Sequence, residues 1–184
     1  MKNPYKPEYT NRPKRLKLKG LGYLGHYTFV LLILFPFLLT VLDYIKFLTG
    51  TYRGVRPIEE LIEGTWIFVL LAFLLFIIQF NRLKFKSVEI SLPADKIIDL
   101  CSKYADVNNL KIKYVSKNEF VAISNRSVFF EWGEWGEMLT VIIQDQKVYI
   151  NSICDPYKRP NMISMGKNKA YKRELIKTIN NASA

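Results

Sequence analysis

Two long stretches without charged side chains constrain this chain more than any other feature. Residues 20–42 and 64–81 contain no Asp, Glu, Lys or Arg. About 20 apolar residues are enough to cross the roughly 30 Å hydrocarbon core of a membrane. The residues from Val69 to Ile78 are apolar on every face of a helix, and a domain of this size has too little protein to cover them. We therefore predict a transmembrane hairpin over residues 20–81, with spans near residues 22–43 and 64–81.

Positively charged residues gather at both flanks of the predicted hairpin. The first flank contains Lys2, Lys6, Arg12, Lys14, Arg15, Lys17 and Lys19 against Glu8 alone, and the second begins with Arg82, Lys84 and Lys86. The loop between the spans balances Lys46, Arg53 and Arg56 with Asp43, Glu59, Glu60 and Glu63. Because Lys and Arg favour the cytoplasmic side of a membrane, we expect an inner-membrane protein with both termini in the cytoplasm.

The remainder of the chain divides into an arm and a domain. Residues 1–19 are polar, are interrupted by Pro4, Pro7 and Pro13, and show no apolar periodicity, so we expect a basic, flexible arm. Residues 82–184 are long enough for one small cytosolic domain.

Residues 82–184 show the mixed periodicity of a small α+β domain. Apolar residues nearly alternate with polar ones over residues 83–92, which predicts an extended segment at the entry to the domain. Over residues 93–105 the apolar residues recur at helical spacing. Strand-like runs follow at residues 110–114, 120–123, 138–143 and 148–152. Asn168 is a suitable N-cap for a final amphipathic helix. The predicted order is α-β-β-β-β-α, an antiparallel sheet with helices on one face.

The basic residues nearest the spans are candidates for binding lipid headgroups. They are Lys14, Arg15, Lys17, Lys19, Arg82, Lys84 and Lys86. Each basic residue beside an anionic leaflet contributes about 1 kcal/mol to membrane binding. The alternative is that these charges only set the topology. The domain from Arg82 onward has 17 basic and 11 acidic residues, a net charge of +6, and the membrane surface accounts for it more simply than RNA or DNA.

One local sequence is unusual enough to suggest a partner site. Residues 131–137 state a Trp-Gly-Glu unit twice, and the candidate partner-binding residues are Glu131, Trp132, Glu134, Trp135 and Glu137. Three carboxylates and two indoles are able to bind a cation or a basic peptide. The alternative is a bulged bend, in which glycine supplies special backbone angles and tryptophan covers a sheet edge.

Catalytic and cofactor motifs find little support in this sequence. His26 is the only histidine and lies beside the first span, so no Ser-His or Cys-His pair can form in the domain. Two cysteines and one distant histidine do not make a tetrahedral metal site. Gly20, Gly22 and Gly25 spell a dinucleotide motif, but no strand precedes them. We predict a non-enzymatic protein without a cofactor.

The C-terminal part resembles a widespread uncharacterised bacterial family. The resemblance lies in Val148-Tyr-Ile-Asn-Ser152, a loop, and Met165-Gly-Lys-Asn168 at the start of the last helix, and covers residues 93–180. The family has Arg at the position of Asn151, and paired acids at the positions of Gly136 and Glu137. The resemblance implies a compact α+β fold and no known activity.

Three functions are compatible with these features. The first is a membrane protein whose cytosolic domain is a scaffold or sensor module that binds a protein partner, itself or the membrane surface. The second is a small membrane effector gated by that domain, or the immunity protein against one. The third is a carboxylate-dependent hydrolase, which rests on Glu131, Glu134 and Glu137 alone.

Overall fold

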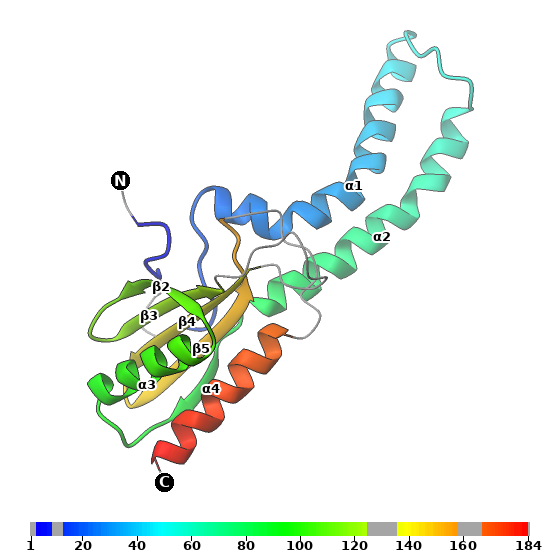
Figure 1. The fold of residues 1–184 in the computed structure, drawn as a ribbon. Coiled ribbons are helices and arrows are strands. Elements are labelled where there is room, and N and C mark those ends of the chain that lie inside the picture. Colours follow the sequence, from blue (N-terminus) through cyan, green and yellow to red (C-terminus); the bar gives the residue numbers. More distant parts are fainter. Residues whose placement is uncertain (1–2, 9–12, 125–135, 158–166, 184) are drawn as a thin grey trace. The chain divides into compact units, whose positions relative to one another are not determined.

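The chain folds into two compact units, seen in a computed structural model. The structure describes residues 3–8, 13–124, 136–157 and 167–183. The helical unit comprises residues 27–80, and the α+β unit comprises residues 1–26 and 81–184 (Figure 1). This layout of two long apolar helices followed by a small α+β domain confirms the predicted fold class.

The helical unit contains most of α1 (Leu21–Leu48) and α2 (Ile58–Arg82). Tyr27 stacks on Phe76, and Phe37 packs against Trp66, with ring centroids 5.3 Å and 5.6 Å apart. Both helices are longer than the predicted spans, because they continue through the polar residues at the ends of each apolar stretch. Residues 58–62, which precede the second predicted span, belong to the start of α2.

The α+β unit is built on a single five-stranded sheet. Its strands are β1 (Lys86–Glu89), β2 (Leu110–Val115), β3 (Glu119–Ser124), β4 (Glu137–Gln144) and β5 (Lys147–Cys154). The order across the sheet is β1-β5-β4-β3-β2, and all neighbouring strands are antiparallel. The four predicted strands are present, and the predicted entry segment supplies the additional strand β1.

Two helices cover the first face of the sheet. They are α3 (Ala94–Val107) and α4 (Lys167–Ser183), and both lie on the same side of the strands (Figure 1). The cluster beneath them includes Ile97 and Cys101 of α3, Leu175 and Ile179 of α4, and Phe120 of β3. All five side chains are fully buried, so this face is a continuous apolar core.

The second face of the sheet is covered by segments without regular secondary structure. Leu16 and Leu18 of the arm and Leu83 after α2 pack on Val121 and Ile153. Part of the arm, expected to be flexible because no apolar periodicity was seen, thus packs on the domain. Leu16 and Leu18 alternate with the charged residues between and around them, which is the strand-like pattern of a half-buried segment.

Candidate functional site

The two flanks of the apolar helices pair with each other. Arg15 and Lys84 are partners in an antiparallel bridge. The amide of Leu16 donates to the carbonyl of Leu83 at 2.8 Å, and the amide of Phe85 donates to the carbonyl of Lys14 at 3.1 Å. We call residues 14–17 and 82–86 the basic ribbon. It joins segments that are almost 70 residues apart in sequence.

The side chain of Asn151 holds one half of this ribbon against β5. Its amide nitrogen donates to the carbonyl oxygens of Arg82 and Lys84, both at 2.9 Å. Asn151 is completely buried. One side chain thus provides the hydrogen-bond donor for two backbone carbonyls at and just after the end of α2. These two hydrogen bonds fix the path of the chain between α2 and β1.

The structure brings together six of the seven candidate headgroup-binding residues on the basic ribbon. Lys14, Lys17, Lys84 and Lys86 are exposed, and Arg15 and Arg82 are partly buried. The seventh, Lys19, follows the ribbon and forms an ion pair with Glu8 at 3.3 Å. In the sequence these residues form two separate groups, and the pairing of the two backbone segments brings the groups next to each other.

The first turns of α1 pack tightly on the chain that follows β5. A Cβ atom on Gly22 would lie 2.7 Å from the Tyr157 ring, and one on Gly25 would overlap the carbonyl oxygen of Pro156. The backbone amide of Lys19 also donates to the Tyr157 hydroxyl at 3.1 Å. Gly22 and Gly25 therefore serve close packing, which explains two of the three glycines in the apparent dinucleotide motif.

A buried aspartate, Asp155, holds the arm against the chain that follows β5. The Tyr5 hydroxyl donates to Asp155 Oδ2 at 3.2 Å, and the amide of Tyr157 donates to Asp155 Oδ1 at 3.0 Å. The rings of Tyr5 and Tyr157 meet edge to face at 5.3 Å. Burial, and then the Asp155 charge, raise the pKa of the Tyr5 hydroxyl, so it remains a neutral donor.

A second basic group lies between β1 and α4. Burial lowers the pKa of Lys172 from its ordinary value, and the charges of Lys86 and Lys169 lower it further. The half-buried Lys172 is therefore influenced by one positive charge from β1 and one from its own helix. The sequence places Lys86 about 80 residues from the other two, so only the fold reveals this group.

The Trp-Gly-Glu segment remains a prediction. Glu131, Trp132, Glu134 and Trp135 lie outside the residues that the structure describes. Glu137 is described, is buried at the start of β4, and is the cross-strand partner of Cys154. Gly136 has a φ of 72°, a value that agrees with the predicted special backbone at this bend.

The cysteines do not form a reactive site. Cys101 and Cys154 are both buried. Burial raises the pKa of the Cys101 thiol to about 12, which keeps it protonated and unreactive. Within the described part of the chain, no three His, Cys, Asp or Glu side chains gather in a way that could hold a metal ion.

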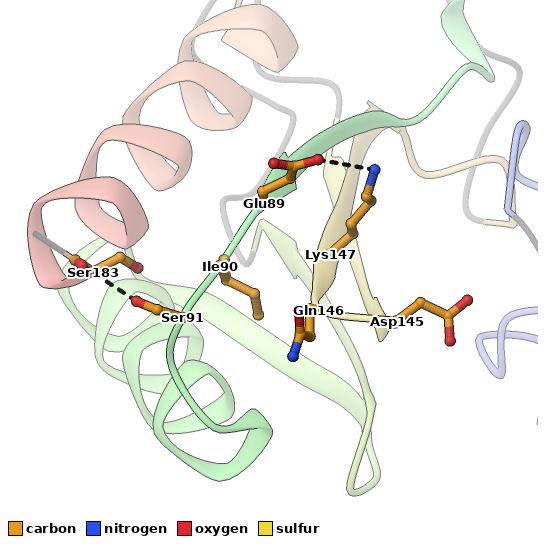
Figure 2. A pocket seen from close by; sticks show the side chains of 7 residues that line it. All are labelled: Glu89, Ile90, Ser91, Asp145, Gln146, Lys147 and Ser183. Carbon is orange, nitrogen blue, oxygen red and sulfur yellow. Dashed lines mark hydrogen bonds and ion pairs between the residues drawn. The ribbon is translucent and has the colours of Figure 1, made fainter.

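A polar hollow lies at the opposite end of the sheet from the basic ribbon. Figure 2 shows that it is lined by Glu89, Ile90, Ser91, Asp145, Gln146, Lys147 and Ser183. Its charges largely satisfy one another, because Lys147 pairs with Glu89 at 3.1 Å. Ser91 donates to the carbonyl of Ser183 at 3.3 Å, which attaches the end of α4 to the chain after β1. These contacts therefore close this end of the sheet, and the residues that line the hollow do not suggest a catalytic or binding role.

No protein-family model matches the chain, and no curated protein matches its sequence. The resemblance to a bacterial family therefore stays a prediction. Its two signature segments do meet in the fold: the Ser152 hydroxyl donates to Asn168 Oδ1 at 3.1 Å, and the Asn168 amide donates to Cys154 Sγ at 3.6 Å. Asn168, predicted as a cap, lies in the first turn of α4 and attaches it to β5.

Proposed function

We propose that this protein is an integral inner-membrane protein whose cytosolic α+β domain is a binding or scaffold module. In this proposal, the basic ribbon holds the domain against the anionic membrane surface. The observation that carries it is the pairing of residues 14–16 with residues 83–85, which places the charges from both flanks on one structure.

The properties of the two helices support membrane insertion. Residues 27–48 of α1 would measure about 33 Å and residues 58–80 of α2 about 35 Å at 1.5 Å per residue, close to the thickness of a hydrocarbon core. Only 11% and 6% of their most apolar stretches are buried. A core helix of a soluble protein would be mostly covered. A cleavable signal peptide also fits poorly, because no small-residue cleavage pattern follows Leu42.

The α+β unit supports a hairpin with both ends on one side. Residues from before α1 and after α2 belong to this single unit, so the chain that leaves it also returns to it. Two crossings of the membrane by the chain between these flanks satisfy that condition. The excess of Lys and Arg in these flanks, compared with the balanced loop, favours the cytoplasm for the unit.

The charges on the ribbon are placed to meet lipid headgroups. Lys14, Lys17, Lys84 and Lys86 are exposed, and the structure gives none of them an ion pair within the residues it describes. At about 1 kcal/mol for each basic residue near an anionic leaflet, four such residues add roughly 4 kcal/mol of attraction. That is enough to keep a tethered domain at the surface, and it should weaken as salt is added.

Cysteine labelling in intact cells tests the topology. An Arg53→Cys substitution in the loop should react with a membrane-impermeant maleimide from outside, whereas Lys103→Cys on α3 should react only after permeabilisation. The buried native thiols keep the background low. Labelling of both positions from the same side would contradict the proposal.

Hydrogen exchange in nanodiscs tests the surface contact. Residues 13–19 and 82–86 should exchange more slowly in discs containing phosphatidylglycerol than in discs of phosphatidylcholine, and the difference should vanish at high salt. Combined Lys14→Gln, Lys17→Gln and Lys84→Gln substitutions should remove the difference. A control with Lys103→Gln, Lys111→Gln and Lys117→Gln changes the same charge at exposed positions elsewhere. Equal exchange in both lipids would refute the contact.

Affinity purification tests the binding role of the module. Full-length protein from native membranes should bring down a partner that a Trp132→Ala/Trp135→Ala variant does not. Loss of the partner would locate its site at the Trp-Gly-Glu segment. If nothing accompanies either protein, the scaffold function is not supported.

A further inference from the structure

The strongest unused feature is the group of three lysines between β1 and α4, which we call the lysine triad. Lys86 lies two residues before Val88, which packs against the cluster beneath the helices, so both side chains share the face that α4 covers. Lys169 and Lys172 are three residues apart on α4 and therefore project from one side of that helix.

Lys172 occupies a position where a charged residue is costly. It lies three residues before the fully buried Leu175 and four before the buried Ile176, at the border of the apolar stripe of α4. Its side chain is half-buried. Burial is the largest cause of its lowered pKa, followed by the charges of Lys86 and Lys169.

Nearby carboxylates do not neutralise the triad. Glu174 on α4 accepts a hydrogen bond from the Tyr104 hydroxyl at 3.2 Å. Glu89 on β1 pairs with Lys147. Within the described residues, the structure gives no ion pair to Lys86, Lys169 or Lys172. An anion bound beside the half-buried Lys172 would offset the repulsion that Lys86 and Lys169 exert on it.

We propose that Lys86, Lys169 and Lys172 form a binding site for a phosphate group, either on a membrane phospholipid or as free phosphate. Phosphate is compact, carries up to two negative charges and accepts several hydrogen bonds, so three ammonium groups can contact it at once. A single carboxylate offers less charge. Lys86 lies four residues after the end of α2, so a headgroup is a natural source.

The lipid source rests on the proposed membrane location, whereas the free-phosphate source does not. The triad also shares only Lys86 with the basic ribbon. Substitutions at Lys14, Lys17 and Lys84 therefore test the ribbon while the triad stays intact, and substitutions at Lys169 and Lys172 do the reverse.

Competitive acetylation of the full-length protein tests the site, with mass spectrometry of each lysine. In nanodiscs of phosphatidylcholine without phosphate, Lys172 should react several-fold faster than Lys177, an exposed lysine of the same helix, because the lowered pKa of Lys172 leaves more free amine. Phosphate binding should restore the pKa and slow the reaction of Lys172 several-fold relative to Lys177.

The source follows from which addition slows the reaction. Slowing by inorganic phosphate in phosphatidylcholine discs identifies free phosphate, and slowing only in discs with phosphatidic acid or phosphatidylglycerol identifies a headgroup. No slowing by any of them overturns the proposal.

Matched variants separate the site from general charge effects. A Lys86→Gln/Lys169→Gln variant should lose the protection of Lys172, and a Lys177→Gln variant should keep it. Protection that survives in the double variant would overturn the proposal. A Lys172→Gln variant should fold with a slightly higher Tm without phosphate, because it removes a half-buried charge. It should lose the Tm increase that the effective addition, inorganic phosphate or anionic lipid, gives the unaltered protein.

Discussion

The two faces of the sheet differ in what covers them. On the first face, α3 and α4 bury a continuous apolar cluster around Phe120 and Leu175. On the second face, the cover consists of the arm and the chain next to α2, and it brings cations, a buried aspartate and close-packed glycines with it. The first face gives the domain its stability. The second face joins that domain to both flanks of the apolar helices through the basic ribbon. The lysine triad lies instead on the side that α4 covers, at the edge strand β1.

The largest expected effect lies on the first face. Phe120→Ala should lower the free energy of unfolding of the α+β unit by about 3–5 kcal/mol, because it empties a fully buried position. Val115→Ala, at an exposed edge position, should change it by less than about 1 kcal/mol. Pulse proteolysis in urea measures both. Equal effects would mean that the helices do not form the main core.

The second face should be weaker but still cooperative. Leu16→Ala and Leu18→Ala should each cost about 2 kcal/mol, at the low end for buried leucine, because the arm covers only one side of each residue. Lys17→Ala, between them, should stay within about 0.5 kcal/mol. Hydrogen exchange of β3 and β4 provides the readout. A flexible arm would instead show no effect at any of the three positions.

Close packing at the start of α1 gives the next effect. Gly25→Ala should destabilise the α+β unit by roughly 1–3 kcal/mol, because its Cβ would overlap the Pro156 carbonyl and displace the chain. Gly64→Ala in α2 is the matched control: it meets no neighbour, and alanine favours helices by about 1 kcal/mol. Tm in detergent distinguishes them. A tolerated Gly25→Ala would disprove the tight contact.

The smallest expected effect on stability comes from the hydrogen bond between Tyr5 of the arm and Asp155. Tyr5→Phe removes the hydrogen bond to Asp155 and should cost about 0.5–1.5 kcal/mol near neutral pH. Tyr114→Phe is a control at a partly buried tyrosine of the same cluster for which the structure gives no hydroxyl hydrogen bond.

The pH dependence of this contact has a definite sign. Burial and Asp155 raise the pKa of Tyr5 above its ordinary value of 10.0, so the folded protein keeps a proton that the unfolded chain loses. The stabilising contribution is complete below about pH 10 and is lost as the pH rises through the folded pKa. Stability measured above pH 10 should therefore fall less steeply in Tyr5→Phe. An unchanged slope would show that Tyr5 is not buried beside Asp155.

Sequence periodicity was sufficient for the first face and insufficient for the second. The helix and strand patterns of residues 93–154 depend on local spacing, and each predicted element is present. β1 was not predicted because it has only four residues, and its identity as a strand depends on pairing with β5. The packing of the arm was not predicted for the same reason, because residues 14–16 pair with residues 83–85, almost 70 residues away in sequence.

The candidate site was only partly predictable. The charges of the ribbon are visible in the sequence, but their union requires the pairing of residues 14–16 with 83–85. Lys172 gives no local signal of its environment, since its neighbours come from β1 and from its own helix. Asn151 was noticed only as a departure from a family pattern, whereas its role is to hold the chain after α2.

The most direct test of the account is a disulfide across the basic ribbon. Arg15 and Lys84 are bridge partners whose neighbours, not they themselves, exchange the hydrogen bonds, and such pairs have Cα atoms about 4.5 Å apart. An Arg15→Cys/Lys84→Cys variant should form a disulfide in native membranes under mild oxidation, and an Arg15→Cys/Lys103→Cys variant should not. Failure of the first pair to link, or equal linking of both, would contradict the pairing on which the proposed function depends.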